Sequence, residues 1–334
     1  MTDPFANDWN RTPDVRPHEG DGAGVPTHRP VNPGAEKHLG VYYPVLDHGF
    51  LALRDYMGTD QSIDMAARCS YGAGTRRVNE IAGLIDYLVR NQHTSPIEMP
   101  EALWHARMPI FVARQWVRHR MASLNEYSGR YSKMLDIYYV PQSRRLGKQS
   151  EDSKQGTSAE PLSDAQKTRA LEILERDAAK CREGYNELLD MDLSRELARI
   201  GLGVNVYTEW YWKSDLKNTL HFVHLRNDAH AQWEIAAYAR IMQAILHDMF
   251  PCLMKSYREH LEDGLRLSAT EVEILRLGLA GKVEDAARLA AKMSGRQWRT
   301  ETNRKLTRLN AELAGQLDAA RAKLAGKKKK TKDE

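Results

Sequence analysis

The sequence predicts an α+β fold, with an antiparallel or mixed sheet flanked by helices and an added helical C-terminal extension. Segments with the period-2 alternation of strands are interspersed among segments with the 3.6-residue period of helices. These segments follow no regular βαβ rhythm, and the sequence has no glycine-rich phosphate loop, which disfavours a doubly wound parallel sheet.

The first elements follow a disordered leader. Residues 1–37 are rich in Pro, Gly, Asp and Arg and lack periodicity. We expect a short helix over 62–68 and a longer one over about 76–91, where apolar residues recur at helical spacing. Residues 102–108 alternate in the pattern of a half-buried strand, and Pro109 suits the first turn of the next helix, IFVARQWV.

The middle of the chain is mostly polar. We expect residues 118–132 to begin where a helix ends and to be loop-like in their middle, and we expect DIYYVP, residues 136–141, to lead into a strand. Residues 144–161 contain few apolar side chains and are predicted to be a mobile insertion. A capping box at Ser163 then begins a long helix that ends near Leu189.

The remaining elements of the main domain lie between residues 194 and 251. Ser194 is predicted to cap a short helix containing Arg199, and VNVYTEWYW is predicted to be a strand. The segment NDAHAQWEIAAYARIMQAILHDMF is predicted to be a strong helix that ends near Pro251. We take residues 38–266 as this domain.

A helical appendage is predicted over residues 267–334. It opens on a capping box formed by Ser268 and Glu271, and it ends in the sequence KKKKTKDE. A leucine stripe is too short to indicate a coiled coil; it comprises Leu306, Leu309, Leu313, Leu317 and Leu324. We expect the basic end to be a solubilising tail rather than a nucleic-acid contact.

Composition excludes several classes of protein. The formal net charge is only +4, so the chain is not a globally basic nucleic-acid coat. Cys69, Cys181 and Cys252 lie far apart, which argues against a disulfide framework or a structural zinc site. The sequence has no apolar run approaching the roughly 20 residues of a membrane span, and its first residues have no apolar signal core. We therefore expect a soluble, cytoplasmic protein.

One stretch concentrates polar chemistry. RHRMASLNEYSGRYS, residues 118–132, holds three arginines, a histidine, three serines and one carboxylate, Glu126. The arginine fork matches phosphate oxygens two at a time, so the stretch indicates a site for an anionic small molecule. A solvated basic face is one alternative. A non-catalytic RNA- or nucleotide-binding protein is another. It would need a continuous basic surface, and the near-neutral net charge and Glu126 argue against such a surface.

The same residues carry a family resemblance. Arg118-His119-Arg120, followed after seven residues by Ser128, resembles the signature of the flavin-dependent thymidylate synthases. Asn125, Glu126, Gly129 and Arg130 agree with it. Between about His48 and His260 the chain is similar to that family in further segments, namely ARCSY, HTSPIE, IFVARQW, RELARI and LRNDAHAQWEI.

The resemblance implies a thymidylate synthase-complementing type fold and a homotetramer with active sites between subunits. It implies that FAD, reduced by NADPH, serves the reductive methylation of dUMP to dTMP. The carbon donor would be 5,10-methylenetetrahydrofolate, and no cysteine nucleophile would take part.

The resemblance also implies residue roles. Arg226 would activate the uracil ring, and His93 would be important for activity near the flavin. The dUMP-binding residues would be Gln115, Arg118, Glu126, Ser128, Gly129, Arg130, Arg199 and Arg226. The FAD-binding residues would be Ser70, Ser95, Arg118, His119, Arg120, Glu126, Asp215, Lys217, His221 and His230.

Three of these positions depart from the family pattern. The family often has Asn-x-Arg where this chain has Asp215-Leu216-Lys217, and His221 stands where Asn is common in some members. A carboxylate at 215 would repel the FAD diphosphate if it pointed inward. Lys217 keeps the charge but lacks the bidentate fork of arginine.

The residues support other chemistries less well. Ser128 could be a nucleophile with His119 as its base, but a serine flanked by Gly and Arg is as well suited to phosphate, and no triad is visible. Pro251-Cys252 is similar to the nucleophile setting of the classical thymidylate synthases only by coincidence. A metal site is not predicted, because no zinc spacing is found among His221, His224, Asp228, His230 and Glu234.

Four tryptophans are expected in the core or an interface, namely Trp104, Trp116, Trp210 and Trp212.

Overall fold

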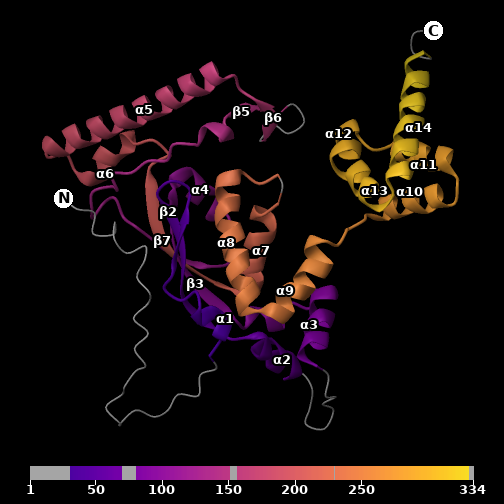
Figure 1. Cartoon of the computed structure of the whole chain (residues 1–334), viewed down its shortest axis with the longest axis horizontal. Helices are drawn as coiled ribbons and strands as arrows, with labels where there is room; N and C mark the ends of the chain where they lie inside the picture. The colour runs from indigo at the N-terminus through magenta and orange to yellow at the C-terminus, as the bar shows by residue number, and fades with distance from the viewer. Residues whose placement is uncertain (1–30, 70–79, 151–155, 229, 331–334) are drawn as a thin grey trace. The chain divides into compact units, whose positions relative to one another are not determined.

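The computed structural model describes residues 31–69, 80–150, 156–228 and 230–330 (Figure 1). The chain divides into two compact units, of which the smaller contains Asp263–Glu334. This division lies close to the boundary that the sequence suggests after residue 266. Within the described ranges, no helix is long and apolar enough to span a membrane.

The larger unit is built on a five-stranded sheet in the order β1-β2-β3-β7-β4. Every neighbouring pair is antiparallel, which confirms the α+β prediction. In chain order the strands are β1 Tyr42–Val45, β2 Gly49–Met57, β3 Glu101–Pro109, β4 Ser123–Glu126 and β7 Tyr207–Asp215. The central pair, β3 and β7, is in register from Glu101 opposite Asp215 to Pro109 opposite Tyr207.

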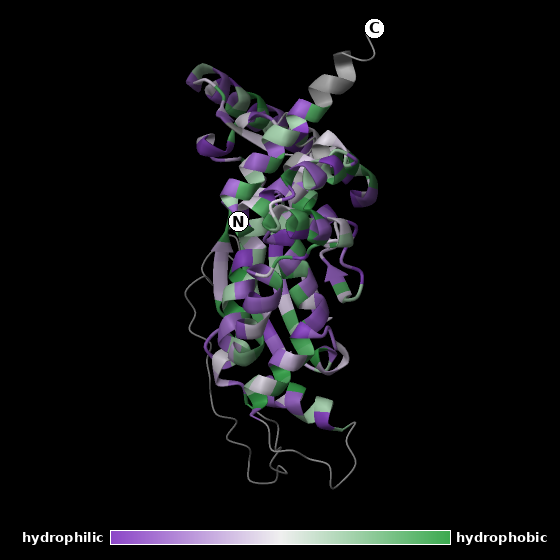
Figure 2. Cartoon of the chain, turned by 90° about the vertical axis from the view of Figure 1, so that its right-hand side faces the viewer, coloured by the Kyte–Doolittle hydropathy of each residue, from purple (hydrophilic) through white to green (hydrophobic). Residues whose placement is uncertain are grey.

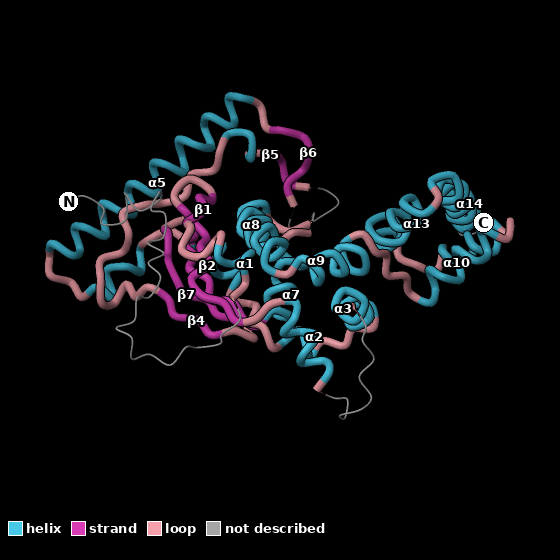
Figure 3. Tube along the Cα trace, turned by 60° about the horizontal axis from the view of Figure 1, so that its bottom comes forward, coloured by secondary structure: helices cyan, strands magenta, loops and turns pink. Residues whose placement is uncertain are grey.

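Helices pack on one face of this sheet, where α7 and α8 lie beside the strands in two views (Figures 1 and 3). The helices of the larger unit are α1 Pro33–Glu36, α2 Asp60–Arg68, α3 Ile81–Arg90, α4 Ile110–Trp116, α5 Asp164–Asp190, α6 Arg195–Ala198, α7 Leu216–Arg226, α8 Trp233–Met249 and α9 Pro251–Tyr257. Two 3-10 turns that matter below are η2 Ser95–Glu98 and η4 Arg199–Gly201.

The core lies between the sheet and these helices. Alternate residues of β3 and β7 point into it, because side chains alternate between the two faces of a strand. The four tryptophans predicted for the core are at most 2% exposed, and Trp116 stacks on Phe222 of α7 with ring centroids 4.4 Å apart. Figure 2 shows hydrophobic and hydrophilic residues interspersed along the elements, as expected where each element buries only one face.

Several local predictions are confirmed. The capping boxes at Ser163 and Ser268 both form, at the starts of α5 and α10. Pro109 ends β3 and is the N-cap of α4, one position earlier than the first helical turn expected for it. Helix α8 ends at Met249 as predicted but begins only at Trp233, after the 227–232 segment.

Two predictions in the polar middle are wrong. The middle of the 118–132 stretch is not loop, because β4 pairs with β7 inside it. Residues 136–141 form no strand, and only an isolated bridge links Tyr138 to Val206. The insertion 144–161 contains β5 Gly147–Gln149 and β6 Thr157–Pro161, which pair in a two-stranded sheet, and its mobility stays a prediction.

The smaller unit is entirely helical in its described residues. It contains α10 Ala269–Leu279, α11 Val283–Ala290, α12 Gly295–Gln297, η6 Trp298–Thr302, α13 Asn303–Leu309 and α14 Ala311–Lys330. The leucine stripe is not continuous, because the helix breaks at Asn310, whose backbone is extended. The unit has a hydrophobic cluster of its own.

Candidate active site

The arginine-rich stretch follows a buried helix end. Trp116 anchors the last turn of α4 in the core, and the chain then runs along the sheet to β4. The hydroxyl of Ser214 on β7 donates to the Met121 carbonyl at 3.2 Å, which holds the intervening segment. Arg118 and Arg120 are both exposed, and neither forms a hydrogen bond or ion pair with another described residue. Two unneutralised guanidinium groups therefore remain available to an anion.

The first pocket, which we call the Ser128 pocket, lies where β4 ends. It measures about 310 Å³. Its lining comes from α4, β4, the loop after β4, η4 and β7, and consists of Ile110, Glu126, Tyr127, Ser128, Gly129, Met134, Arg199, Leu202 and Thr208. The structure thus brings together four of the residues predicted to bind dUMP.

Gly129 is required by close packing in this pocket. A Cβ at that position would lie 2.5 Å from the Met134 sulfur and 3.1 Å from Cδ of Arg199. The Arg199 side chain therefore lies against the glycine backbone. Arg199 itself is half-buried and has no hydrogen bond or ion pair with another described residue, so its charge is free for a ligand.

The other polar groups of the Ser128 pocket are already oriented. Glu126 accepts a hydrogen bond of 2.7 Å from the hydroxyl of buried Thr208. The Ser128 hydroxyl accepts the backbone N–H of Arg130 at 3.3 Å, and no histidine of the described chain bonds it. A serine nucleophile activated by His119 is thus unsupported. Thr208 was missed by the sequence analysis, although its place in the alternating strand YTEWYW was a usable signal.

Arg130 is placed differently from Arg199. Its Nε and Nη2 both lie 3.2 Å from the Glu196 carboxylate, and both side chains are more than half exposed. In this conformation Arg130 does not line the Ser128 pocket, and a phosphate would compete with Glu196 for it.

Arg226 meets His119 at the end of α7. Arg226 Nε donates to His119 Nε2 at 3.0 Å, and its Nη2 donates to the Gln115 carbonyl at 3.1 Å. The Gln115 side chain bonds Gln232, which precedes α8. Because no described carboxylate pairs with Arg226, this guanidinium is fixed in place but keeps its full charge.

The local electrostatics keep His119 neutral. Burial, with the charges of Arg226 and then His221, lowers the pKa of His119 to about 4. Its Nε2 can therefore accept from Arg226, and its proton resides on Nδ1. Burial and the neighbouring Arg118 lower the pKa of Arg226 as well, which is the expected sign of a cation without a counter-charge.

A second pocket contains two further predicted residues, and we call it the His93 pocket. It measures about 610 Å³ and lies among α2, α3 and η2. Exposed His93 and Ser95 line it, together with Cys69, Tyr87 and Met99. The ring of His93 meets that of Tyr87 edge-on, with centroids 5.6 Å apart. Ser70, another predicted flavin residue, lies outside the described residues.

Helix α7 carries three further residues predicted to bind FAD, namely Asp215 at its N-cap, Lys217 and His221. Its N-cap is Asp215, whose carboxylate accepts from the backbone N–H of Asn218 at 2.9 Å and from its side chain at 2.7 Å. The carboxylate is thus committed to the helix end, where negative charge is favourable. Lys217 approaches Glu98 of η2 at 3.6 Å. One turn on, His221 faces the His119 ring, with centroids 5.7 Å apart.

His230 is not brought to these pockets. It is exposed and bonds the Asp228 carboxylate at 2.8 Å through both its backbone N–H and its ring. No group of three or more potential metal ligands is found in the part of the chain that the structure describes.

Cys252 has no nucleophilic setting. Its backbone N–H donates to Asp60 at 2.8 Å at the start of α9. Burial and the Asp60 carboxylate raise the pKa of its thiol, which disfavours the reactive thiolate.

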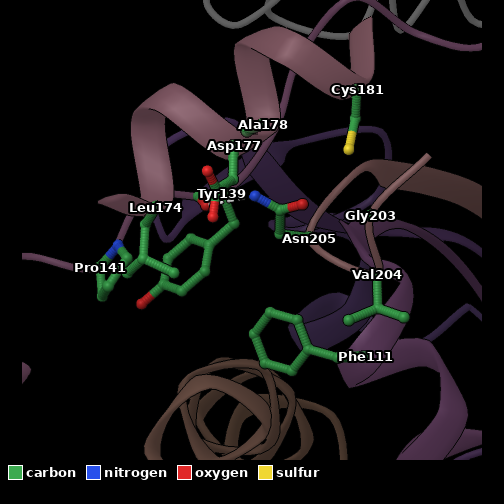
Figure 4. Close-up of a pocket in the computed structure, with 10 residues that line it drawn as sticks. All are labelled: Phe111, Tyr139, Pro141, Leu174, Asp177, Ala178, Cys181, Gly203, Val204 and Asn205. Atoms are coloured by element: carbon green, nitrogen blue, oxygen red, sulfur yellow. Dashed lines mark hydrogen bonds between the residues drawn. The ribbon is translucent and has the colours of Figure 1, made fainter. Parts of the chain in front are cut away.

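An apolar cavity of about 390 Å³ lies elsewhere, between α5 and the β3–α4 junction (Figure 4). Leu174, Ala178 and Cys181 of α5 face Phe111 and Tyr139 across it. None of its lining residues belongs to the predicted site, and its lining is almost entirely apolar, which does not suit an anionic ligand.

Comparisons with known proteins show which protein family the chain resembles. A family model described as thymidylate synthase complementing protein matches residues 52–252. A flavin-dependent thymidylate synthase from Ruegeria pomeroyi is 45% identical, covering 82% of this chain and 91% of its own. One from Treponema denticola is 48% identical, covering 72% and 90%. A crystal structure of the UMP/dUMP methylase PolB from Streptomyces cacaoi with 5-Br UMP has a TM-score of 0.59 and 27% identity, covering 65% of this chain and 97% of that one.

Proposed function

The chain belongs to the flavin-dependent thymidylate synthases, and from this premise we propose that it binds FAD and converts dUMP to dTMP. The carbon would come from 5,10-methylenetetrahydrofolate and the reducing equivalents from NADPH. Reductive methylation yields dTMP and tetrahydrofolate.

The observation that carries this proposal is the Ser128 pocket. A nucleoside monophosphate needs a cation for its phosphate, hydroxyl or backbone donors, and a shape that fits the sugar and base. The pocket offers the free Arg199 guanidinium, the Ser128 hydroxyl and the close backbone of Gly129. Each charge-assisted hydrogen bond contributes about 1.5–3 kcal/mol.

The residues around α7 fit FAD. A diphosphate requires positive charge, which exposed Arg118 and Arg120 supply without a carboxylate to displace. Ser95 adds a hydroxyl, and the Asp215 carboxylate is directed to the N-terminus of α7 by its bonds to Asn218. When bound and reduced, FAD supplies the hydride that this reaction needs.

The chain's own contribution to the chemistry is centred on Arg226. Without a cysteine nucleophile, the uracil must become nucleophilic at C5, which places negative charge on its ring. A preorganised guanidinium stabilises such charge without reorganisation. His119 and the Gln115 carbonyl hold Arg226 in one orientation, and neither carries a negative charge that would neutralise it.

We further propose that the active site is completed in a homotetramer. Apart from Gly129, the dUMP and flavin residues that the structure describes are exposed or half-buried in a single chain, and large apolar side chains flank them. Met121 is 71% exposed, Tyr131 78% and Ile200 79%. Apolar side chains beside polar site residues are typical of a surface that a partner covers. The three cysteines are free, in keeping with the reducing cytoplasm in which we place the enzyme.

The purified full chain tests this proposal. We expect a flavin absorption spectrum, reduction of the flavin by NADPH, and dTMP formation that requires both dUMP and methylenetetrahydrofolate. Light scattering should give the mass of four chains. A folded, colourless protein that forms no dTMP with added FAD would contradict the assignment.

A further inference from the structure

The smaller unit carries a different electrostatic character from the rest of the chain. Residues 263–334 contain 17 Lys and Arg against 10 Asp and Glu, a net charge of +7. The whole chain carries +4, so residues 1–262 sum to −3. The net positive charge of this protein therefore comes from its C-terminal unit, whereas a solubilising function would be served by charge of either sign.

The unit also has the order of elements of a helix-turn-helix. Helix α11 spans Val283–Ala290, a turn of four residues follows, and a new helix begins at Gly295. Ser294 caps that helix by accepting the backbone N–H of Gln297 at 3.1 Å. Two helices joined by a turn of three or four residues form the motif that places its second helix in the DNA major groove.

The second helix runs without a break from 295 to 309, through α12, the π turn η6 and α13. One face is anchored in the core by Trp298, Thr302 and Leu306, all at most 1% exposed. The indole N–H of Trp298 donates to Asp318 of α14 at 2.8 Å, which fixes the helix on the following one. We call this segment the 295–309 helix.

The packing beneath it is specific. Three alanines of α11 are fully buried, and such small side chains let neighbouring helices approach closely. Buried Glu271 of α10 accepts from Lys305 at 2.9 and 3.0 Å and from Thr302 at 3.0 Å. The charge that faces inward is thus neutralised, and the helix is held rigidly with its other surface outward.

That outer surface is basic. Gln297, Arg304 and Arg308 are exposed, as is one carboxylate, Glu301. By sequence, the 295–309 helix holds four arginines, at 296, 299, 304 and 308. Arg pairs with guanine and Gln with adenine in the major groove, and Arg also binds phosphate. A basic helix of this size fits that groove, whereas a single-stranded RNA site would need aromatic side chains on which bases stack.

We propose that residues 263–334 form a helix-turn-helix module that binds duplex DNA through the 295–309 helix. The tail KKKKTK adds phosphate attraction without sequence information. This proposal differs from the expectation from the sequence that the basic end is a solubilising tail rather than a nucleic-acid contact. It does not depend on the activity of the larger unit.

The test uses the full chain and a fluorescein-labelled 30-bp duplex of random sequence, with anisotropy measured at 50 and 200 mM NaCl. We expect binding that weakens steeply with salt. Arg304→Glu should weaken it roughly five- to 150-fold, and Gln297→Glu serves as a second variant on the same helix. Arg276→Glu is the matched control, since Arg276 lies on α10, exposed and paired with Glu273.

Four results would each overturn the proposal. The first is the absence of duplex binding at 50 mM NaCl, and the second is an equal loss of duplex affinity in Arg304→Glu and Arg276→Glu. The third is tighter binding of a single-stranded RNA of the same length. The fourth is a loss of duplex binding when Lys327–Lys330 are replaced by Gln, while Arg304→Glu has no effect. An unchanged circular dichroism spectrum shows that each variant remains folded.

Discussion

The larger unit contains two arginine–histidine clusters that differ in one group. On one face of the sheet, Glu209 accepts from His105 at 2.6 Å and from Arg107 at 2.9 Å. At the end of α7, Arg226 bonds His119 at 3.0 Å without any described carboxylate. The first cluster is neutralised and holds strands together, whereas the second leaves its cation for a ligand.

The electrostatic consequences follow that difference. Burial raises the pKa of Glu209, but the hydrogen bond from His105 and the charge of Arg107 outweigh it and lower the pKa below its usual value. In the other cluster, burial and neighbouring cations lower the pKa of His119. A cluster whose charges neutralise each other contributes to stability. A cluster whose cation has no counter-charge is suited to binding an anionic ligand.

Removing Glu209 should have the largest effect. Glu209→Ala removes the carboxylate that pairs with buried Arg107 and His105, and we expect a loss of about 3–5 kcal/mol in the free energy of unfolding. Urea denaturation measures it. Glu101→Ala is the control, because Glu101 forms an exposed pair with Lys213 and should cost about 0–1 kcal/mol. Equal costs in the two variants would show that the sheet cluster is not structural.

Removing Arg226 should affect chemistry and spare stability. Arg226→Ala should retain FAD and its reduction by NADPH, while the rate of dTMP formation falls about 10²–10³-fold. Lysine should rescue poorly, since a point charge does not reproduce the planar fork. Arg169→Ala, on the exposed face of α5, is the control. A near wild-type rate at saturating substrates would rule out the assigned role.

The sequence predicted the core and most helices, because these depend on periodicity and caps that neighbouring residues encode. It did not reveal β4, whose four residues SLNE are all exposed on an edge and show no apolar alternation. It also did not reveal the bond between Arg226 and His119, which are 107 residues apart in the chain. The family resemblance named both residues; only the fold shows that they touch.

A smaller effect is expected at Ser128, on the binding side of the comparison. Ser128→Ala removes one donor from the Ser128 pocket, so we expect dUMP affinity to fall by about 1–3 kcal/mol with measurable turnover remaining. Ser132→Ala, an exposed serine outside the pocket lining, is the control. A covalent Ser128–nucleotide adduct detected by mass spectrometry would instead make this residue a nucleophile.

The last prediction concerns the pH dependence of stability that His119 confers. With a pKa of about 4 in the folded chain and 6.5 ordinarily, His119 stays neutral over a range in which the unfolded chain takes up a proton. Stability therefore falls as pH decreases from about 6.5 to about 4. In His119→Gln, whose amide oxygen still accepts from Arg226, that component is absent.

The measurement is the free energy of unfolding of the wild type and of His119→Gln between pH 4 and 8. The wild type should lose more stability than the variant as pH falls through this window, whereas His48→Gln, at an exposed histidine, should follow the wild type. Parallel curves for the wild type and His119→Gln would mean that His119 is protonated in the folded chain. In that case Arg226 could not donate to it, and the contrast between the two clusters would fail at its central bond.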